Sequence, residues 1–326
     1  MNSLSLDAHE QSRPLVKPFR LARGTRTEAR IVIATITDGK HTGRGEAVPI
    51  RRYGQNPLSV LAQIESVKNV RFDRHTLQQL LPAGAARNAL DCALWDLEAK
   101  QSGKRAWELA NIAMAPTVET AFTIGLDTPD AMAAAAQANA SAPILKLKLG
   151  GDDLDLPRVE AVRKEAPAAR LFVDANESWS PAHYRKIVPP LKELGVELIE
   201  QPFPADTDEV LESLEHPLPV CADESSHTSA DLARLLNRYE IINIKLDKTG
   251  GLTEALLLAE RARQSGLKLL VGCMVCTSLG IAPARLLASI TDYADLDGPL
   301  LMGSDREHGL AYENGRIGLP SRELWG

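Results

Sequence analysis

Eight apolar, strand-like segments recur from the middle to the end of this chain, and this repetition is the feature that most limits its fold. They begin 22 to 27 residues apart, and amphipathic stretches of helical periodicity, such as residues 252–264, separate most of them. Eight strand–helix units of this size predict a closed parallel barrel with its functional residues at the carboxyl ends of the strands. The segments are residues 119–125, 144–149, 170–175, 197–201, 219–223, 241–246, 267–272 and 293–297.

The regions before and after these units have different patterns. Residues 29–37 alternate between apolar and polar side chains, and a second strand near 43–48 follows the turn Asp38-Gly39. From 57 to 110 the periodicity is helical. The sequence therefore predicts an α/β fold: a modified TIM-type (β/α) barrel with an α+β N-terminal capping domain that the C-terminal tail completes. We expect residues 1–117 to form the capping domain, 118–299 the barrel, and 300–326 a tail packed back on the cap.

The composition is that of a globular protein and argues against several classes of partner. The chain is 44% hydrophobic, and its formal charge of -6 provides no basic surface for nucleic acid and little attraction to anionic membranes. No apolar run approaches the roughly 20 residues that span a bilayer, and the first ten residues lack the pattern of a secretory signal. We expect a cytoplasmic protein that binds neither nucleic acid nor membranes. A homo-oligomer is compatible with this sequence.

The four cysteines do not form a disulfide framework at this chain length. Cys273 and Cys276 form a Cys-x-x-Cys motif, but a structural zinc site needs a second pair of ligands, and a redox motif of the thioredoxin type opens a helix near the start of a domain. We interpret this pair as two thiols at the end of a buried strand. Cys92 and Cys221 lie in apolar patterns and are expected in the core.

Three consecutive predicted strands each end on a carboxylate. Asp174, Glu200 and Asp223 follow the apolar runs of the third, fourth and fifth strands. Neighbouring strands lie about 4.8 Å apart, so the three side chains can converge on one ion. Oxygen anions without histidine or paired thiolates suit Mg²⁺, with Mn²⁺ as the expected substitute. A single carboxylate here would more simply cap a helix, but three in succession predict a metal site, with Asn176 and Glu224 as neighbours of its ligands.

Lysines flank the carboxylates on both sides. Lys146 and Lys148 alternate with leucines on the second strand, so both point to one face, and Lys245 ends the sixth strand. A metal-bound carboxylate acidifies its α-proton because the ion stabilises the enediolate, and lysines on opposite faces could remove and return that proton. Lys248 lies beyond the strand, which leaves Lys245 as the candidate base on that side. The alternative is that these lysines are only counter-ions to the triad.

The strand-end motifs resemble the enolase superfamily, in its muconate-lactonizing subgroup, and within it the dipeptide epimerases. The motifs are Leu-Lys-Leu-Lys148, Val173-Asp-Ala-Asn, Ile199-Glu-Gln-Pro, Ala222-Asp-Glu-Ser and Ile242-Asn-Ile-Lys, and further matching segments cover almost the whole chain. The resemblance implies that Lys148 and Lys245 are the acid/base catalysts, that Mg²⁺ binds Asp174, Glu200 and Asp223, and that Lys146 helps to hold the metal-bound carboxylate. The superfamily is known for lysine or histidine bases beside Mg²⁺.

The same resemblance suggests a dipeptide substrate. Asp295 and Asp297, on the eighth strand, resemble the pair that marks dipeptide epimerases, and a free α-ammonium needs such buried anions. Thr123 and the segment from Cys273 to Thr277 are expected to line the pocket. The cap segment Arg20-Leu-Ala-Arg-Gly-Thr-Arg26 is in the position of a specificity loop, where Arg23 or Arg26 could pair with a glutamate side chain.

The leading hypothesis is therefore inversion of the glutamate α-carbon in L-Ala-D/L-Glu dipeptides, a reaction of murein peptide recycling. An N-acylamino acid racemase or a lyase of the o-succinylbenzoate synthase type would use the same lysines and metal. The substrates of these enzymes, however, have no free ammonium for Asp295 and Asp297 to bind. A class I aldolase would need a Schiff-base lysine and no carboxylate triad. A non-catalytic scaffold should have lost part of this set, and none is missing.

Overall fold

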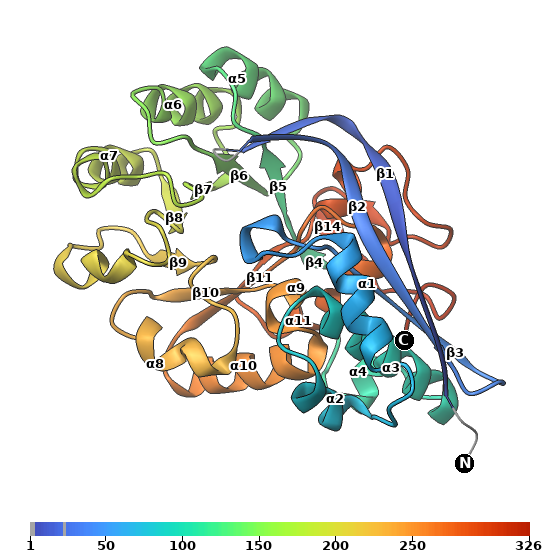
Figure 1. Cartoon of the computed structure of the whole chain (residues 1–326). Coiled ribbons are helices and arrows are strands. Elements are labelled where there is room, and N and C mark those ends of the chain that lie inside the picture. The colour runs from blue at the N-terminus through green and yellow to red at the C-terminus, as the bar shows by residue number, and fades with distance from the viewer. Residues whose placement is uncertain (1–3, 22–23) are drawn as a thin grey trace.

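The computed structural model describes residues 4–21 and 24–326, and its centre is a nearly closed barrel of eight parallel strands (Figure 1). The strands pair in sequence order, each with the next. This confirms the predicted modified TIM-type barrel with an N-terminal cap. The strands are β5 (Ala121–Ile124), β6 (Ile144–Lys148), β7 (Arg170–Asp174), β8 (Val196–Glu200), β9 (Val220–Ala222), β10 (Ile241–Ile244), β11 (Lys268–Gly272) and β12 (Tyr293–Asp295).

Side chains, rather than a backbone ladder, join the first and last strands of the barrel. The backbone N–H of Leu296 donates to Thr120 Oγ1 at 2.8 Å, and that of Thr123 donates to Asp297 Oδ2 at 2.6 Å. Asp297 is therefore part of the closure of the barrel as well as of its mouth.

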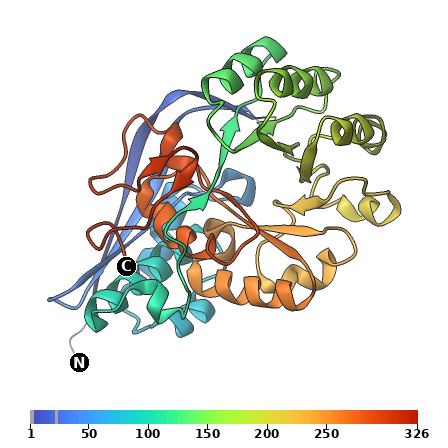
Figure 2. The same cartoon turned by 180° about the vertical axis from the view of Figure 1, so that it is seen from behind.

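Helices cover the outside of the barrel, as Figures 1 and 2 show. Pro129 and Pro181 occupy the first helical positions of α5 and α7, where a missing N–H carries no cost. After β12 the 3₁₀ turn η4 (Gly298–Leu301) takes the place of a further helix, which is the modification of the barrel; another, η2 (Asp208–Ser213), lies between β8 and β9. The α-helices are α5 (Pro129–Ala138), α6 (Asp155–Glu165), α7 (Pro181–Glu193), α8 (Leu232–Leu235), α9 (Leu246–Thr249), α10 (Leu252–Gln264) and α11 (Ser278–Leu287).

An apolar layer with one residue from each strand fills the barrel beneath its mouth. Successive side chains on a strand point to opposite faces, so the next inward position is two residues further along each strand. This layer forms the floor of the site, and the candidate functional side chains lie directly above it. Its members are Ala121, Ile144, Phe172, Leu198, Cys221, Ile241, Leu270 and, half-buried, Tyr293.

The cap is an antiparallel sheet covered by helices. Figure 1 shows β1 and β2 as a long ribbon that arches from the cap helices to the barrel mouth. Helix α3 is buried along almost its whole length because it lies between this sheet and the barrel. The elements are β1 (Ser5–Leu21), β2 (Gly24–Thr37), β3 (Thr42–Ala47), η1 (Arg51–Tyr53), α1 (Pro57–Ser66), α2 (Arg74–Leu80), α3 (Ala85–Ser102) and α4 (Ala106–Leu109).

Two buried carboxylates join the cap to the barrel. Glu46 on β3 accepts the backbone N–H of Thr277 at 2.7 Å and lies 2.8 Å from the guanidinium of Arg306. Asp247, in α9 of the barrel, accepts the backbone N–H of Val48 at 2.9 Å. These bonds fix the height of the cap above the strand ends.

Part of the C-terminal tail pairs with the start of the barrel, whereas we expected the tail to pack on the cap. The predicted first strand, 119–125, is divided at Thr120 into β4 (Val118–Glu119) and β5, and β4 pairs with the tail strand β14 (Arg316–Ile317), which also pairs with β13 (Tyr312–Glu313). The last residues reach the cap, where Gly326 N–H donates to Asp96 at 2.7 Å, and the C-terminus lies beside the cap helices in both views. The domain boundaries at 117/118 and 299/300 remain our proposal. Among the helices of the described residues, none has the length and apolar character to cross a membrane.

Candidate active site

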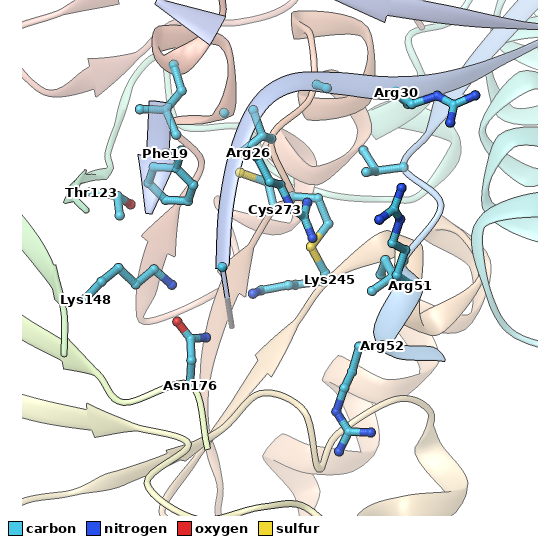
Figure 3. Close-up of a pocket in the computed structure, with 18 of the residues that line it drawn as sticks. Phe19, Arg26, Arg30, Arg51, Arg52, Thr123, Lys148, Asn176, Lys245 and Cys273 are labelled. Carbon is cyan, nitrogen blue, oxygen red and sulfur yellow. The ribbon is translucent and has the colours of Figure 1, made fainter. Parts of the chain in front are cut away.

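A cavity of about 610 Å³ lies between the cap and the carboxyl ends of the barrel strands (Figure 3). The cap contributes Phe19, Arg26 and Arg51 to its wall, and the barrel contributes, among others, Lys148 and Lys245. The cavity therefore lies where a parallel barrel places its chemistry.

The polar side chains of the site form the layer directly above the apolar floor. In each strand, or directly after it, the residue two positions beyond the floor residue points into the barrel. Only at Gly272 does this layer have no side chain. The others are Thr123, Lys146, Asp174, Glu200, Asp223, Asn243 and Asp295.

The three predicted metal ligands meet in this layer. One carboxylate oxygen each of Asp174, Glu200 and Asp223 lies within 4.8 Å of the others, and all three residues are buried. Three anions so close need cations, and carboxylate oxygens are the ligands that Mg²⁺ prefers. Two more buried oxygens at this mouth, Asn176 Oδ1 and Asp295 Oδ1, have no hydrogen-bond partner among the described residues. The donor set and these vacant acceptors fit a hydrated divalent ion.

Lysines surround the carboxylates. Lys148 Nζ lies 2.5 Å from Asp174 Oδ2, and Lys245 Nζ lies 2.7 Å from Asp223 Oδ2. Lys146 is almost fully buried and lies 2.7 Å from Glu200 Oε2 and 3.2 Å from Asp174 Oδ2. In Figure 3 the amino groups of Lys148 and Lys245 point toward one another across the cavity.

Burial and neighbouring charges divide the three carboxylates into two kinds. Burial opposes ionisation of Asp174, but Lys148 and Lys146 outweigh it and lower its pKa to about 2. The same balance, with Lys245 and Lys248, lowers the pKa of Asp223. Burial and repulsion from Asp174 and Asp223 raise the pKa of Glu200 to about 7. The ionised form of Glu200 is therefore the least stabilised of the three, and a bound cation would lower the pKa of Glu200.

The lysine that faces Asp223 is strongly protonated in this arrangement. Burial opposes the charge on Lys245, but Asp223 outweighs it and raises the pKa of that amine. For the same kind of reason the pKa of Lys146 is raised by Asp295, Glu200 and Asp174 against burial. A lysine can act as a base here only when the charge of its carboxylate is taken up by another cation.

The two carboxylates at the end of the eighth strand, Asp295 in β12 and Asp297 just after it, have different partners. Asp295 Oδ2 lies 2.8 Å from Lys146 Nζ. Asp297 has a neutral hydrogen-bond partner, the backbone N–H of Thr123. Burial, with repulsion from Asp295, raises the pKa of Asp297 to about 6. Both line the cavity, and together they make this side of the wall acidic.

Two further residues of the site were not identified from the sequence. Asn243 Nδ2 donates to Glu200 Oε1 at 2.9 Å, and the alternation of residues 241–245, which places it on the face of Lys245, could have revealed it. Lys248, judged to lie beyond the strand, is buried, with its Nζ 2.6 Å from Asp223 Oδ1. The single helical turn of α9 returns Lys248 to the strand end, which strand periodicity does not foresee.

Of the remaining predicted residues, four line the cavity and one lies outside the described part of the chain. Thr123, Cys273, Asn176 and Glu224 line the cavity, and Asn176 Nδ2 lies 3.4 Å from Glu224 Oε1. Arg23 lies outside the described residues. Figure 3 shows Arg26, the alternative to Arg23, reaching from β2 toward Lys245.

Comparisons with known proteins match both parts of the chain. Residues 5–110 match the mandelate racemase / muconate lactonizing enzyme N-terminal domain, and residues 130–323 match the enolase C-terminal domain-like family. The L-Ala-D/L-Glu epimerase of Escherichia coli (strain K12) is 47% identical over 95% of this chain and 98% of its own. An N-acetyl-D-glutamate racemase of Pseudoalteromonas sp is 43% identical over 91% of this chain and 95% of its own.

Solved structures agree with these relatives. An enolase family member from Agrobacterium tumefaciens with homology to dipeptide epimerases, with bound sodium and L-Ala-L-Glu, is 49% identical, with a TM-score of 0.97 over 99% of this chain and 100% of its own. A dipeptide epimerase from Enterococcus faecalis V583, complexed with Mg and L-Leu-L-Tyr, is 27% identical, with a TM-score of 0.92 over 98% of each chain. The expectation of an enzyme of the racemase and epimerase class is confirmed. The chain belongs to the enolase superfamily, in its mandelate racemase / muconate lactonizing enzyme family.

Proposed function

We propose that this chain is a Mg²⁺-dependent dipeptide epimerase that inverts the glutamate α-carbon of L-Ala-D/L-Glu dipeptides. The observation that carries the proposal is the pair of lysines, Lys148 and Lys245, whose amino groups face each other across the cavity. The carboxylates of the intervening strands lie between them. An α-carbon held at this point would have one amine on each side.

The two lysines would carry out a 1,1-proton transfer. A cation held by Asp174, Glu200 and Asp223, with Mg²⁺ favoured and Mn²⁺ as a substitute, would draw charge from the substrate carboxylate and make the α-proton more acidic. One lysine removes the α-proton from its side, and the other, still protonated, donates a proton to the opposite side. Because each lysine serves one face, the configuration of the carbon is inverted.

The walls of the cavity support a dipeptide substrate with an acidic side chain. Asp297, buried beside Thr123, would bind the free α-ammonium of the first residue, with Asp295 close by. Arg26 reaches into the cavity from the cap, and we propose that it binds the side-chain carboxylate of glutamate. On the resemblance alone, we place the reaction in the cytoplasmic recycling of murein peptides.

A second candidate function is racemisation of N-acetylglutamate. The relative from Pseudoalteromonas sp, at 43% identity, favours it. Such a substrate has no ammonium, so it would leave the acidic wall formed by Asp295 and Asp297 without a cation from the substrate. A lyase of the o-succinylbenzoate synthase type would do the same. The acidic wall therefore favours the dipeptide.

The test is incubation in D₂O with Mg²⁺, followed by NMR of the glutamate α-proton. We expect L-Ala-L-Glu to lose this proton signal and to give the L-Ala-D-Glu diastereomer, with a kcat/KM well above that for N-acetylglutamate. The proposal would be contradicted if L-Ala-L-Glu showed no α-proton exchange and no epimerisation. Efficient racemisation of N-acetylglutamate alone would establish the second candidate instead.

A further inference from the structure

We infer that Gln201 is the positioning residue that sets the spacing of the three metal-ligand carboxylates. Gln201 directly follows Glu200 and is fully buried. Its backbone φ of +37° lies in the left-handed region, which residues other than glycine rarely adopt. A buried, strained glutamine next to a metal ligand is held there by its contacts.

Gln201 connects the exit loops of all three ligand-bearing strands. Its carbonyl accepts the N–H of Glu177, which follows β7, at 2.9 Å, and its own N–H donates to the carbonyl of Cys221 on β9 at 2.9 Å. Its side-chain Oε1 accepts the backbone N–H of Asp223 at 2.8 Å and that of Ser225 at 3.1 Å. One residue thus joins the chain after Asp174 to the ligands Glu200 and Asp223.

The side-chain amide of Gln201 can have only one orientation in this network. Backbone N–H groups only donate, so the oxygen of the amide must face Asp223 and Ser225. The Nε2 then donates to the carbonyl of Phe203 at 2.9 Å, which can only accept and so favours the same orientation. It also lies 2.8 Å from Ser225 Oγ and 3.0 Å from the hydroxyl of Tyr239, and these two contacts need hydroxyl oxygens that accept.

Asp208 makes those two hydroxyls acceptors. Its Oδ2 lies 2.6 Å from Ser225 Oγ and 2.7 Å from the hydroxyl of Tyr239, so both hydroxyls donate to it and offer their lone pairs to Gln201. Arg238 Nη1 lies 2.6 Å from Asp208 Oδ1 and stabilises its charge. The order of the network therefore runs from Asp208 through Ser225 and Tyr239 to Gln201 and the backbone of Asp223.

The inference rests on the proposed metal centre, and it concerns metal affinity before any turnover. The test is titration of the purified protein with Mn²⁺ alone, with the free ion counted by electron paramagnetic resonance. Gln201→Met keeps the length of the side chain and removes both ends of the amide. We expect its Kd for Mn²⁺ to rise about 10- to 100-fold, as is typical when a partner of a metal ligand is lost.

Two more variants calibrate this result. Tyr239→Phe removes one hydroxyl, two steps away from Asp223, and should raise the Kd by a smaller factor. Gln78→Met is the control for the loss of a hydrogen-bonded side-chain amide, because Gln78 lies in the cap, where it is half-buried and its Nε2 donates to the carbonyl of Arg74 and to Asp91. The Kd of this variant should stay within twofold of wild type.

A folded Gln201→Met protein whose Kd stays within twofold of wild type would overturn the inference. If that variant does not fold, an unchanged Kd in both Tyr239→Phe and Ser225→Ala would overturn it. The wild-type titration separates the two proposals. A wild-type protein that binds no Mn²⁺ would overturn the metal centre and the role of Gln201 together. Failure to epimerise dipeptides, with tight Mn²⁺ binding and the expected variant series, would contradict the proposed substrate and support the role of Gln201.

Discussion

Lys146 Nζ lies 2.8 Å from Asp295 Oδ2, so one of the two carboxylates at the end of the eighth strand is already paired with a lysine from β6, two strands away around the barrel. Asp297 is bound instead by the neutral backbone N–H of Thr123. The ammonium of the proposed dipeptide substrate would therefore be stabilised more by Asp297, whose charge has no direct cationic partner at hydrogen-bond distance among the residues described. The two aspartates are two residues apart in the sequence but have different partners in the site.

The first prediction concerns substrate selectivity. Asp297→Asn keeps an acceptor for the Thr123 N–H and removes the charge, so kcat/KM for L-Ala-L-Glu should fall by about 100-fold, in the range for loss of a buried charge partner. The kcat/KM for N-acetylglutamate should change little, because that substrate has no ammonium. Equal losses for both substrates would show that Asp297 acts through the fold of the barrel instead.

The pH dependence of that selectivity follows from the same carboxylate. Burial, with repulsion from Asp295, raises the pKa of Asp297 to about 6. As the pH falls through this value Asp297 becomes neutral, so the ratio of kcat/KM for the dipeptide to that for N-acetylglutamate should decrease below about pH 6. Lysine titrations affect both substrates and cancel in the ratio. In Asp297→Asn the ratio should no longer vary with pH, which is the control.

A third prediction separates the two lysines by stereochemistry. Lys148→Ala and Lys245→Ala should each lower epimerisation by about 100- to 10,000-fold, the usual contribution of an acid/base group. Each variant keeps one lysine and should still exchange the α-proton of one diastereomer in D₂O, with opposite diastereomers for the two variants. Lys186 is an exposed lysine that pairs with Asp153, and Lys186→Ala should behave as wild type. Exchange of the same diastereomer in both variants would contradict the two-base mechanism.

The sequence was sufficient to predict the barrel and the carboxylate triad because both follow from local periodicity. Alternation along a strand places Asp174 two residues beyond Phe172 on one face, and each of the triad strands shows the same spacing. The one-turn helix α9, which returns Lys248 to Asp223, has no such periodicity. The pairing of β4 with β14 joins strands of two residues each, too short to leave a pattern. Contacts between distant segments, such as Asp247 with Val48, depend on how the cap sits on the barrel.

The contact between Asp247 of the barrel and Val48 of the cap predicts how the unfolding free energy depends on pH. Burial raises its pKa to about 7, above the value of about 3.9 in an unfolded chain. The unfolded state therefore loses this proton first, and the contribution of Asp247 to stability falls as the pH rises from about 4 to about 7. Asp247→Asn keeps an acceptor for Val48 and removes this penalty. Its stability relative to wild type should increase by about 2 kcal/mol between pH 5 and pH 8 in urea unfolding. A difference that does not vary with pH would contradict this assignment.

Gly272, the last residue of β11, leaves the space that Asn243 and Lys245 occupy. A Cβ at Gly272 would lie 2.5 Å from Asn243 Oδ1 and 2.9 Å from Lys245 Cε, closer than such atoms approach. Gly272→Ala must therefore displace Asn243, which donates to Glu200, and shift the stem of a proposed base. We expect a loss of about 1–3 kcal/mol in unfolding free energy, as for overpacked cores, and a fall of about 100-fold in kcat/KM, since small misplacements of catalytic groups cost that much.

Gly318→Ala is the matched control for this substitution, because its nearest neighbour would lie 3.7 Å from the new Cβ, an ordinary contact. It should leave both the unfolding free energy and kcat/KM close to wild type. Near-normal turnover in Gly272→Ala would mean that Asn243 can move without disturbing Glu200 or Lys245. A loss of stability with normal turnover would assign Gly272 to packing alone. A loss of turnover that exceeds the loss of folded protein would show that the missing side chain in the polar layer is a requirement of the chemistry.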